Sequence, residues 1–94
     1  MTASIQAIVD GIRALSCTAP FYLGTYTMVS GATSSTIQTG IANAIEGGVR
    51  DIRVGYNADA NLTVAGGYRA ADQTHLSNTG AVKAGNDWAD LIYP

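Results

Sequence analysis

The stretch FYLGTYTMV, from Phe21 to Val29, decides the fold that this sequence predicts. It is rich in aromatic and β-branched residues, which favour an extended strand. It carries few polar side chains on either face, as is typical of a strand that is covered on both faces. A second, shorter strand is expected in DIRVGYNA, from Asp51 to Ala58.

Segments with helical spacing of apolar residues lie before, between and after these two strands. Thr2 or Ser4 is expected to cap the first helix, and Gly47 with Gly48 is expected to end the second. The isoleucine stripes of the helices are expected to form the core. The three predicted helices cover TASIQAIVDGIRALS (2–16), STIQTGIANAIEGG (35–48) and SNTGAVKAGNDWADLIYP (77–94).

The alternation of helices and strands predicts an α/β fold in which the strands run parallel. Two parallel strands make no stable sheet alone, because independent stability usually needs at least three strands. The free edge of the 21–29 strand would also invite aggregation unless another strand paired with it. We therefore expect a single, partial domain over residues 1–94, with a short sheet that another chain completes. That chain is either a second copy in a homodimer or a separate N-terminal half.

Composition narrows the class of protein. Only 13% of the 94 residues are charged, about half the usual ~25%, which indicates that part of the surface is buried against a partner. The five Lys and Arg residues are scattered, so nucleic-acid binding is not expected. No run reaches ~18 apolar residues, so no membrane span is expected. The single cysteine, Cys17, fits a reducing compartment and favours the cytoplasm.

The candidate catalytic residues lie in the stretch ADQTHLSNTGAVKAG, residues 71–85. It contains His75, the only histidine, with Asp72 three residues before it. An imidazole can take a proton from a nucleophile, and a carboxylate on its other nitrogen fixes the tautomer. Read without that chemistry, His75 is a loop histidine that bonds locally, Asp72 forms an Asx-turn, and Ser77 or Asn78 caps the last helix.

The block DQTHLSNTG, from Asp72 to Gly80, resembles the last signature block of the SGNH (GDSL-type) hydrolases. The resemblance implies a flavodoxin-like, three-layer α/β/α fold, with the whole of this chain matching the C-terminal half. It further implies that His75 is the general base, that Asp72 orients it, and that the substrate is a small ester.

The rest of that family's pattern is not present. The sequence has no Gly-Asp-Ser nucleophile block and no Gly-x-Asn-Asp block; AGND at 84–87 lies inside the predicted last helix and reads as coincidence. The resemblance thus implies an ester hydrolase segment that supplies the Asp-His part of a Ser-His-Asp triad and is incomplete alone. A partner chain would supply the serine and the oxyanion hole.

Two alternatives remain open. The chain is a non-catalytic structural or interaction module in a homo-oligomer, or it is a small hydrolase with an unusual nucleophile such as Ser30, which follows the first strand. A Cys17–His75 thiol dyad is disfavoured, because the two residues are expected at opposite ends of the sheet. Asp59 and Asp87 show no metal-ligand clustering, so neither a metal nor a cofactor is expected.

Overall fold

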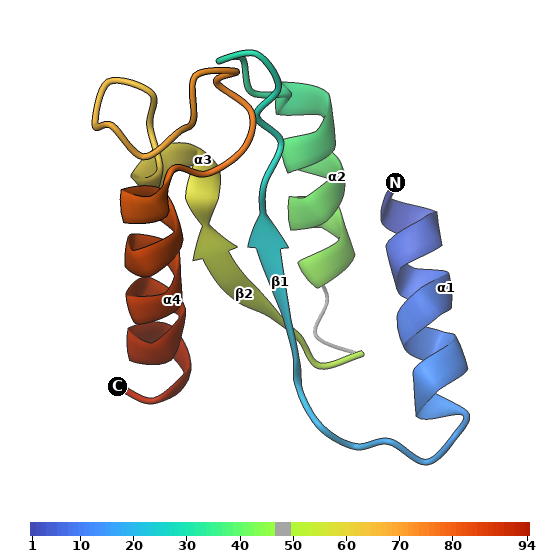
Figure 1. Cartoon of the computed structure of the whole chain (residues 1–94). Coiled ribbons are helices and arrows are strands. Elements are labelled where there is room, and N and C mark those ends of the chain that lie inside the picture. The colour runs from blue at the N-terminus through green and yellow to red at the C-terminus, as the bar shows by residue number, and fades with distance from the viewer. Residues whose placement is uncertain (47–49) are drawn as a thin grey trace.

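The computed structural model describes residues 1–46 and 50–94. Two parallel strands and the helices around them form one body, in which the strands lie side by side at the centre (Figure 1). The mixed α/β class with a small parallel sheet is confirmed. In chain order the elements are α1 (Thr2–Arg13), β1 (Phe21–Thr25), α2 (Ser35–Ile45), β2 (Ile52–Asn57), α3 (Ala58–Asn61) and α4 (Asn78–Ile92).

The β1–β2 ladder contains one extra residue in β2. Phe21 pairs with Ile52 and Leu23 with Val54, but Thr25 pairs with Asn57. Such a bulge shifts the side chains that follow it to the other face. The two backbones approach closely here, since a Cβ on Gly55 would lie 2.5 Å from the Leu23 carbonyl carbon. Glycine is therefore required at this position.

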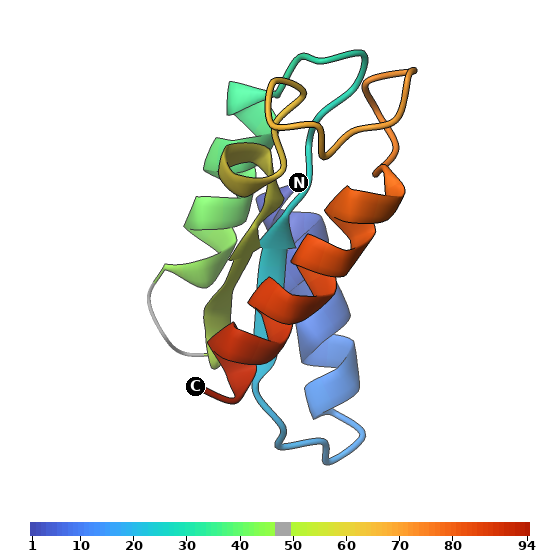
Figure 2. The ribbon, with the colours of Figure 1, turned by 60° about the vertical axis from the view of Figure 1, so that its left-hand side comes forward.

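The bulge lets Tyr56 join the core beneath α4, although Val54 lines the groove on the α2 face and is 70% exposed. Leu62 and Ala58, just beyond the end of β2, are fully buried in the same cluster. Figure 2 shows α4 in front of the sheet, with α1 and α2 behind it. The buried residues of this cluster are Tyr56, Ala58, Leu62 and Ala84, with Tyr68, Leu76 and Trp88 packed against them.

The opposite face of the sheet is less completely covered. The helix α2 contacts both strands, whereas α1 packs mainly on α2. The expectation that the isoleucine stripes form the core is wrong for Ile8, which is 64% exposed; Leu15 at the end of the same segment is 82% exposed. None of the five residues of β1 is fully buried, contrary to the expectation of a strand covered on both faces.

The first strand is shorter than the sequence predicted, ending at Thr25 rather than at Val29. Beyond Thr25 the backbone leaves the ladder, because the Thr27 N–H donates to the carboxylate of Asp59 and not to β2. Val29 pairs instead with Ala32 in an isolated antiparallel bridge. The second strand lies within its predicted range.

The helix ends follow the predictions only in part. Ser34 and Ser77 are the side-chain N-caps of α2 and α4, and Ser77 is one of the two residues expected to cap α4. The predicted cap of α1 is wrong: Met1 is the N-cap, and the Thr2 hydroxyl donates to the Gly40 carbonyl at 2.8 Å. The short helix α3 was not predicted. The predicted stop at Gly47 and Gly48 lies outside the described residues.

Candidate functional site

The loop between α3 and α4 carries both predicted site residues. It lies at the same end of the sheet as the β1–α2 loop, at the top of Figure 1. The loop closes on itself through a bridge between Arg69 and Leu76, and the Ala70 N–H donates to the His75 carbonyl at 2.8 Å. The residues between them, which include Asp72, therefore form a hairpin-like turn.

The structure brings Asp72 and His75 into direct contact. One carboxylate oxygen of Asp72, Oδ1, accepts the backbone N–H groups of Thr74 at 2.9 Å and of His75 at 3.0 Å. The other, Oδ2, contacts the imidazole Nδ1 of His75. Asp72 therefore uses one oxygen to stabilise the turn and the other to contact the imidazole. The Asx-turn expected for Asp72 and its expected contact with His75 are both present.

These contacts keep the Asp72 carboxyl ionised. The hydrogen bond with the His75 imidazole, followed by the backbone bonds from Thr74 and His75, lowers the pKa of Asp72 to about 2. Asp72 is therefore ionised at neutral pH and acts as an acceptor. The His75 side chain is 80% exposed. Within residues 1–46 and 50–94, no group hydrogen-bonds to its Nε2, which is open to a nucleophile or to solvent.

The β1–α2 loop packs its tip against this turn. Reciprocal hydrogen bonds between Val29 and Ala32 enclose Ser30 and Gly31, whose φ values of 49° and 80° are those of a type I′ turn. The Ser30 N–H donates to the Thr74 hydroxyl at 2.8 Å, and the Gly31 N–H donates to a carbonyl of the same turn. Ser30 therefore lies beside the Asp72–His75 loop, but it is held by its backbone and not by a bond from its hydroxyl to the imidazole.

Asp59 has partners that were not foreseen from the sequence. It is buried and accepts from the Thr27 N–H at 2.8 Å, the Thr27 hydroxyl at 2.6 Å and the Gln38 amide at 2.8 Å. Burial raises the pKa of the Asp59 carboxyl, but the hydrogen bonds from Gln38 and Thr27 outweigh it, so the pKa lies below its usual value. The position of Asp59 after the second strand was the available signal, because strand ends of a parallel sheet meet at one edge.

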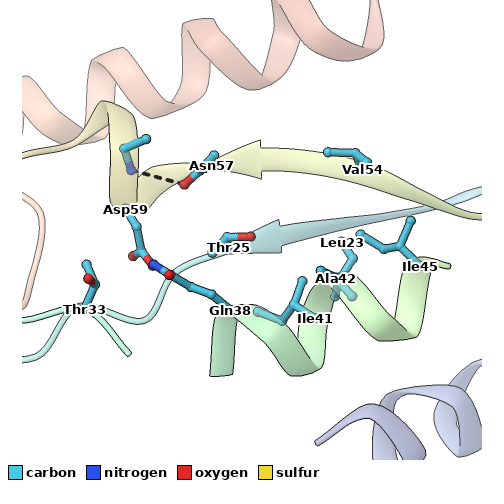
Figure 3. Close-up of a pocket in the computed structure, with 11 residues that line it drawn as sticks. Leu23, Thr25, Thr33, Gln38, Ile41, Ala42, Ile45, Val54, Asn57 and Asp59 are labelled. Carbon is cyan, nitrogen blue, oxygen red and sulfur yellow. Dashed lines mark hydrogen bonds between the residues drawn. The ribbon is translucent and has the colours of Figure 1, made fainter. Parts of the chain in front are cut away.

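A groove of about 480 Å³ runs along the α2 face of the sheet (Figure 3). Its apolar side consists of side chains from α2 and both strands, and Asp59, Gln38 and Asn57 lie at its polar end. Neither Asp72 nor His75 lines it. The lining residues are Leu23, Thr25, Thr33, Gln38, Ile41, Ala42, Ile45, Val54, Asn57, Asp59 and Ala60.

The residue that ends the DQTHLSNTG block has a packing role. Gly80 lies in the first turn of α4, and a Cβ there would lie 2.0 Å from the Tyr68 carbonyl oxygen. The Ser77 N–H donates to the same carbonyl at 3.0 Å. Because Gly80 has no side chain, the first turn of α4 can pack directly against the backbone of Tyr68, which leads into the His75 loop.

The remaining candidates lie elsewhere. Cys17 is half-buried in the α1–β1 connection, at the end of the sheet opposite to the His75 loop (Figure 1), so the two residues form no dyad. Asp87 is on α4, where it accepts from the Tyr56 hydroxyl and pairs with Lys83 at 2.9 Å. The described parts of the chain contain no cluster of metal-ligating side chains. No described helix is long and apolar enough to cross a membrane.

Comparisons of this chain with protein-family models, with curated proteins and with solved structures find no match.

Proposed function

We propose that this chain is the part of an SGNH-type ester hydrolase that carries the Asp-His pair, and that a second chain carries the nucleophile. One observation supports this most strongly: the Asp72 carboxylate contacts Nδ1 of His75 while Nε2 stays open. In a Ser-His-Asp triad the carboxylate holds the imidazole in this way, and the other nitrogen takes the proton of the serine.

In the proposed reaction His75 Nε2 removes the proton from a serine hydroxyl as that oxygen attacks the ester carbonyl. Asp72 stays ionised and stabilises the imidazolium that forms, which its low pKa favours. The imidazolium then gives its proton to the leaving alcohol. General base catalysis of this kind contributes roughly 10²–10⁴-fold to the rate.

The second chain is also proposed to complete the sheet and a flavodoxin-like, three-layer domain. β1 pairs only with β2 among the described strands, so its other edge has no neighbour there. The Phe21 N–H donates to the Asp51 carbonyl on the β2 side. In a parallel strand the backbone N–H and C=O groups of alternate residues point to opposite edges. The backbone groups of Tyr22 and Gly24 are therefore available to a further strand.

A fluorophosphonate probe tests this proposal. The tagged chain is expressed in its native host, treated with the probe and captured. The mass of each co-purified chain is then measured by intact-mass spectrometry. The proposal expects a second chain that carries one label per molecule, and no label in cells that express His75→Ala. It also expects the Tyr22 and Gly24 amides to gain protection from hydrogen exchange in the captured complex.

The alternatives give different results. A label on this chain, mapped to Ser30, would show that the site is complete within it; the docking of the Ser30 turn on Thr74 favours this as the second candidate. A homo-oligomer without any His75-dependent label would support the structural module instead.

A further inference from the structure

Arg69 connects the Asp72–His75 turn to the core. Its Nε donates to the Leu62 carbonyl at 2.8 Å, and its Nη1 donates to the Thr74 carbonyl at 2.8 Å. Leu62 is fully buried, whereas Thr74 immediately precedes His75 in the turn. The planar guanidinium of Arg69, whose N–H donors have a fixed geometry, therefore links the packed core to Thr74, the residue before His75.

The rest of the guanidinium is also enclosed. Nη2 of Arg69 is buried and makes no hydrogen bond with the described residues. Its positive charge is close enough to contribute to the lowered pKa of Asp59, which in turn holds Thr27 beyond the end of β1. An arginine kept in this position, with one donor unpaired, has its orientation determined by the two carbonyls that it bridges.

We propose that Arg69 is a positioning residue for His75. By holding the Thr74 carbonyl, it keeps the turn in the conformation in which Asp72 faces Nδ1, and so fixes the proton on Nδ1 and leaves Nε2 as the base. The tautomer of a neutral histidine is set by the hydrogen bond that its other nitrogen makes. The inference rests on the proposed function only for its catalytic meaning; the tautomer itself is a property of the free chain.

The test is the ¹⁵N spectrum of the imidazole at a pH at which His75 is neutral. Because the chain has one histidine, the signal is unambiguous. The wild-type chain should show the Nδ1–H tautomer, and Arg69→Met should lower the fraction of that tautomer by about twofold or more. Arg50→Met is the matched control: it removes an arginine that pairs with Asp10 at 2.8 Å, away from this turn, and should leave the tautomer unchanged.

A folded Arg69→Met chain that keeps the wild-type Nδ1–H fraction would overturn the inference. If that variant does not fold, Arg69→Lys decides. It keeps the charge but not the two-carbonyl fork, so a reduced Nδ1–H fraction supports the inference and a wild-type fraction overturns it. Since no substrate is present, loss of the tautomer would uphold the role of Arg69 even if the labelling experiment found no hydrolase.

Discussion

Asp72 binds His75 through both of its carboxylate oxygens, one to the backbone N–H at 3.0 Å and the other to the imidazole Nδ1. The bond to the backbone N–H fixes the position of the His75 backbone, and the contact with Nδ1 fixes the orientation of the imidazole ring. Because the two contacts use different oxygens, they can be separated by substitution. This separation makes the catalytic interpretation testable apart from the fold of the turn.

The first prediction concerns the titration of Asp72. The pKa of its carboxyl is lowered from the ordinary value of 3.8 to about 2. A lowered carboxyl pKa means that the contacts of the turn stabilise the folded chain fully above about pH 4, and that this contribution is lost as the pH falls through about 2. A ¹³C carboxyl titration should place the midpoint there, and His75→Ala should move it upward. An unchanged midpoint in His75→Ala would show that the imidazole does not hold the carboxylate.

A second prediction compares two glycines of α4. Gly80→Ala would place a Cβ 2.0 Å from the Tyr68 carbonyl oxygen, whereas a Cβ at Gly85 meets nothing within 4 Å. Gly85→Ala should therefore raise the free energy of unfolding by up to about 1 kcal/mol, the usual helix preference for alanine. Gly80→Ala should lower it by more than that, as overpacking typically costs about 1–3 kcal/mol. Urea denaturation of both variants checks this, and equal stabilities would contradict the tight contact at Gly80.

A third prediction concerns the buried carboxylate at the ends of the strands. Asp59→Ala leaves the Thr27 N–H without its acceptor in a buried position. An unsatisfied buried donor costs roughly 1–3 kcal/mol of stability. Thermal unfolding should show this loss for Asp59→Ala. The control Asp90→Ala removes an exposed carboxylate of α4 and should change stability by less than about 0.5 kcal/mol. A loss no larger than that of the control would contradict the role of Asp59.

The sequence predicted those features that depend on neighbours within a few residues. Ser77 was one of two residues expected to cap the last helix, and its hydroxyl accepts an N–H only three residues ahead. The contact between Asp72 and His75 is equally local; their spacing allows it, and the resemblance of the surrounding DQTHLSNTG block to a hydrolase signature suggested it. The alternation of apolar helices and strands was likewise enough for the α/β class.

Other features depend on contacts between distant residues, and these were missed. The early end of β1 results from the bond between Thr27 and Asp59, which are 32 residues apart. The docking of Ser30 on Thr74 joins residues 44 apart. The bulge at Gly55 appears only when the two strands are aligned, because a glycine in a strand does not by itself show where another backbone approaches.

The measurement that tests the central claim most directly uses Asp72→Asn. The amide oxygen of asparagine can still accept from the Thr74 and His75 N–H groups, but its NH₂ would face Nδ1 in place of Oδ2. The turn is kept while the imidazole is driven to the wrong tautomer. We predict that the rate of fluorophosphonate labelling in the captured complex falls roughly 10²–10⁴-fold, the usual contribution of a general base. A labelling rate equal to that of the wild type would contradict the assignment of His75 as the base of a hydrolase and of Asp72 as the residue that orients it.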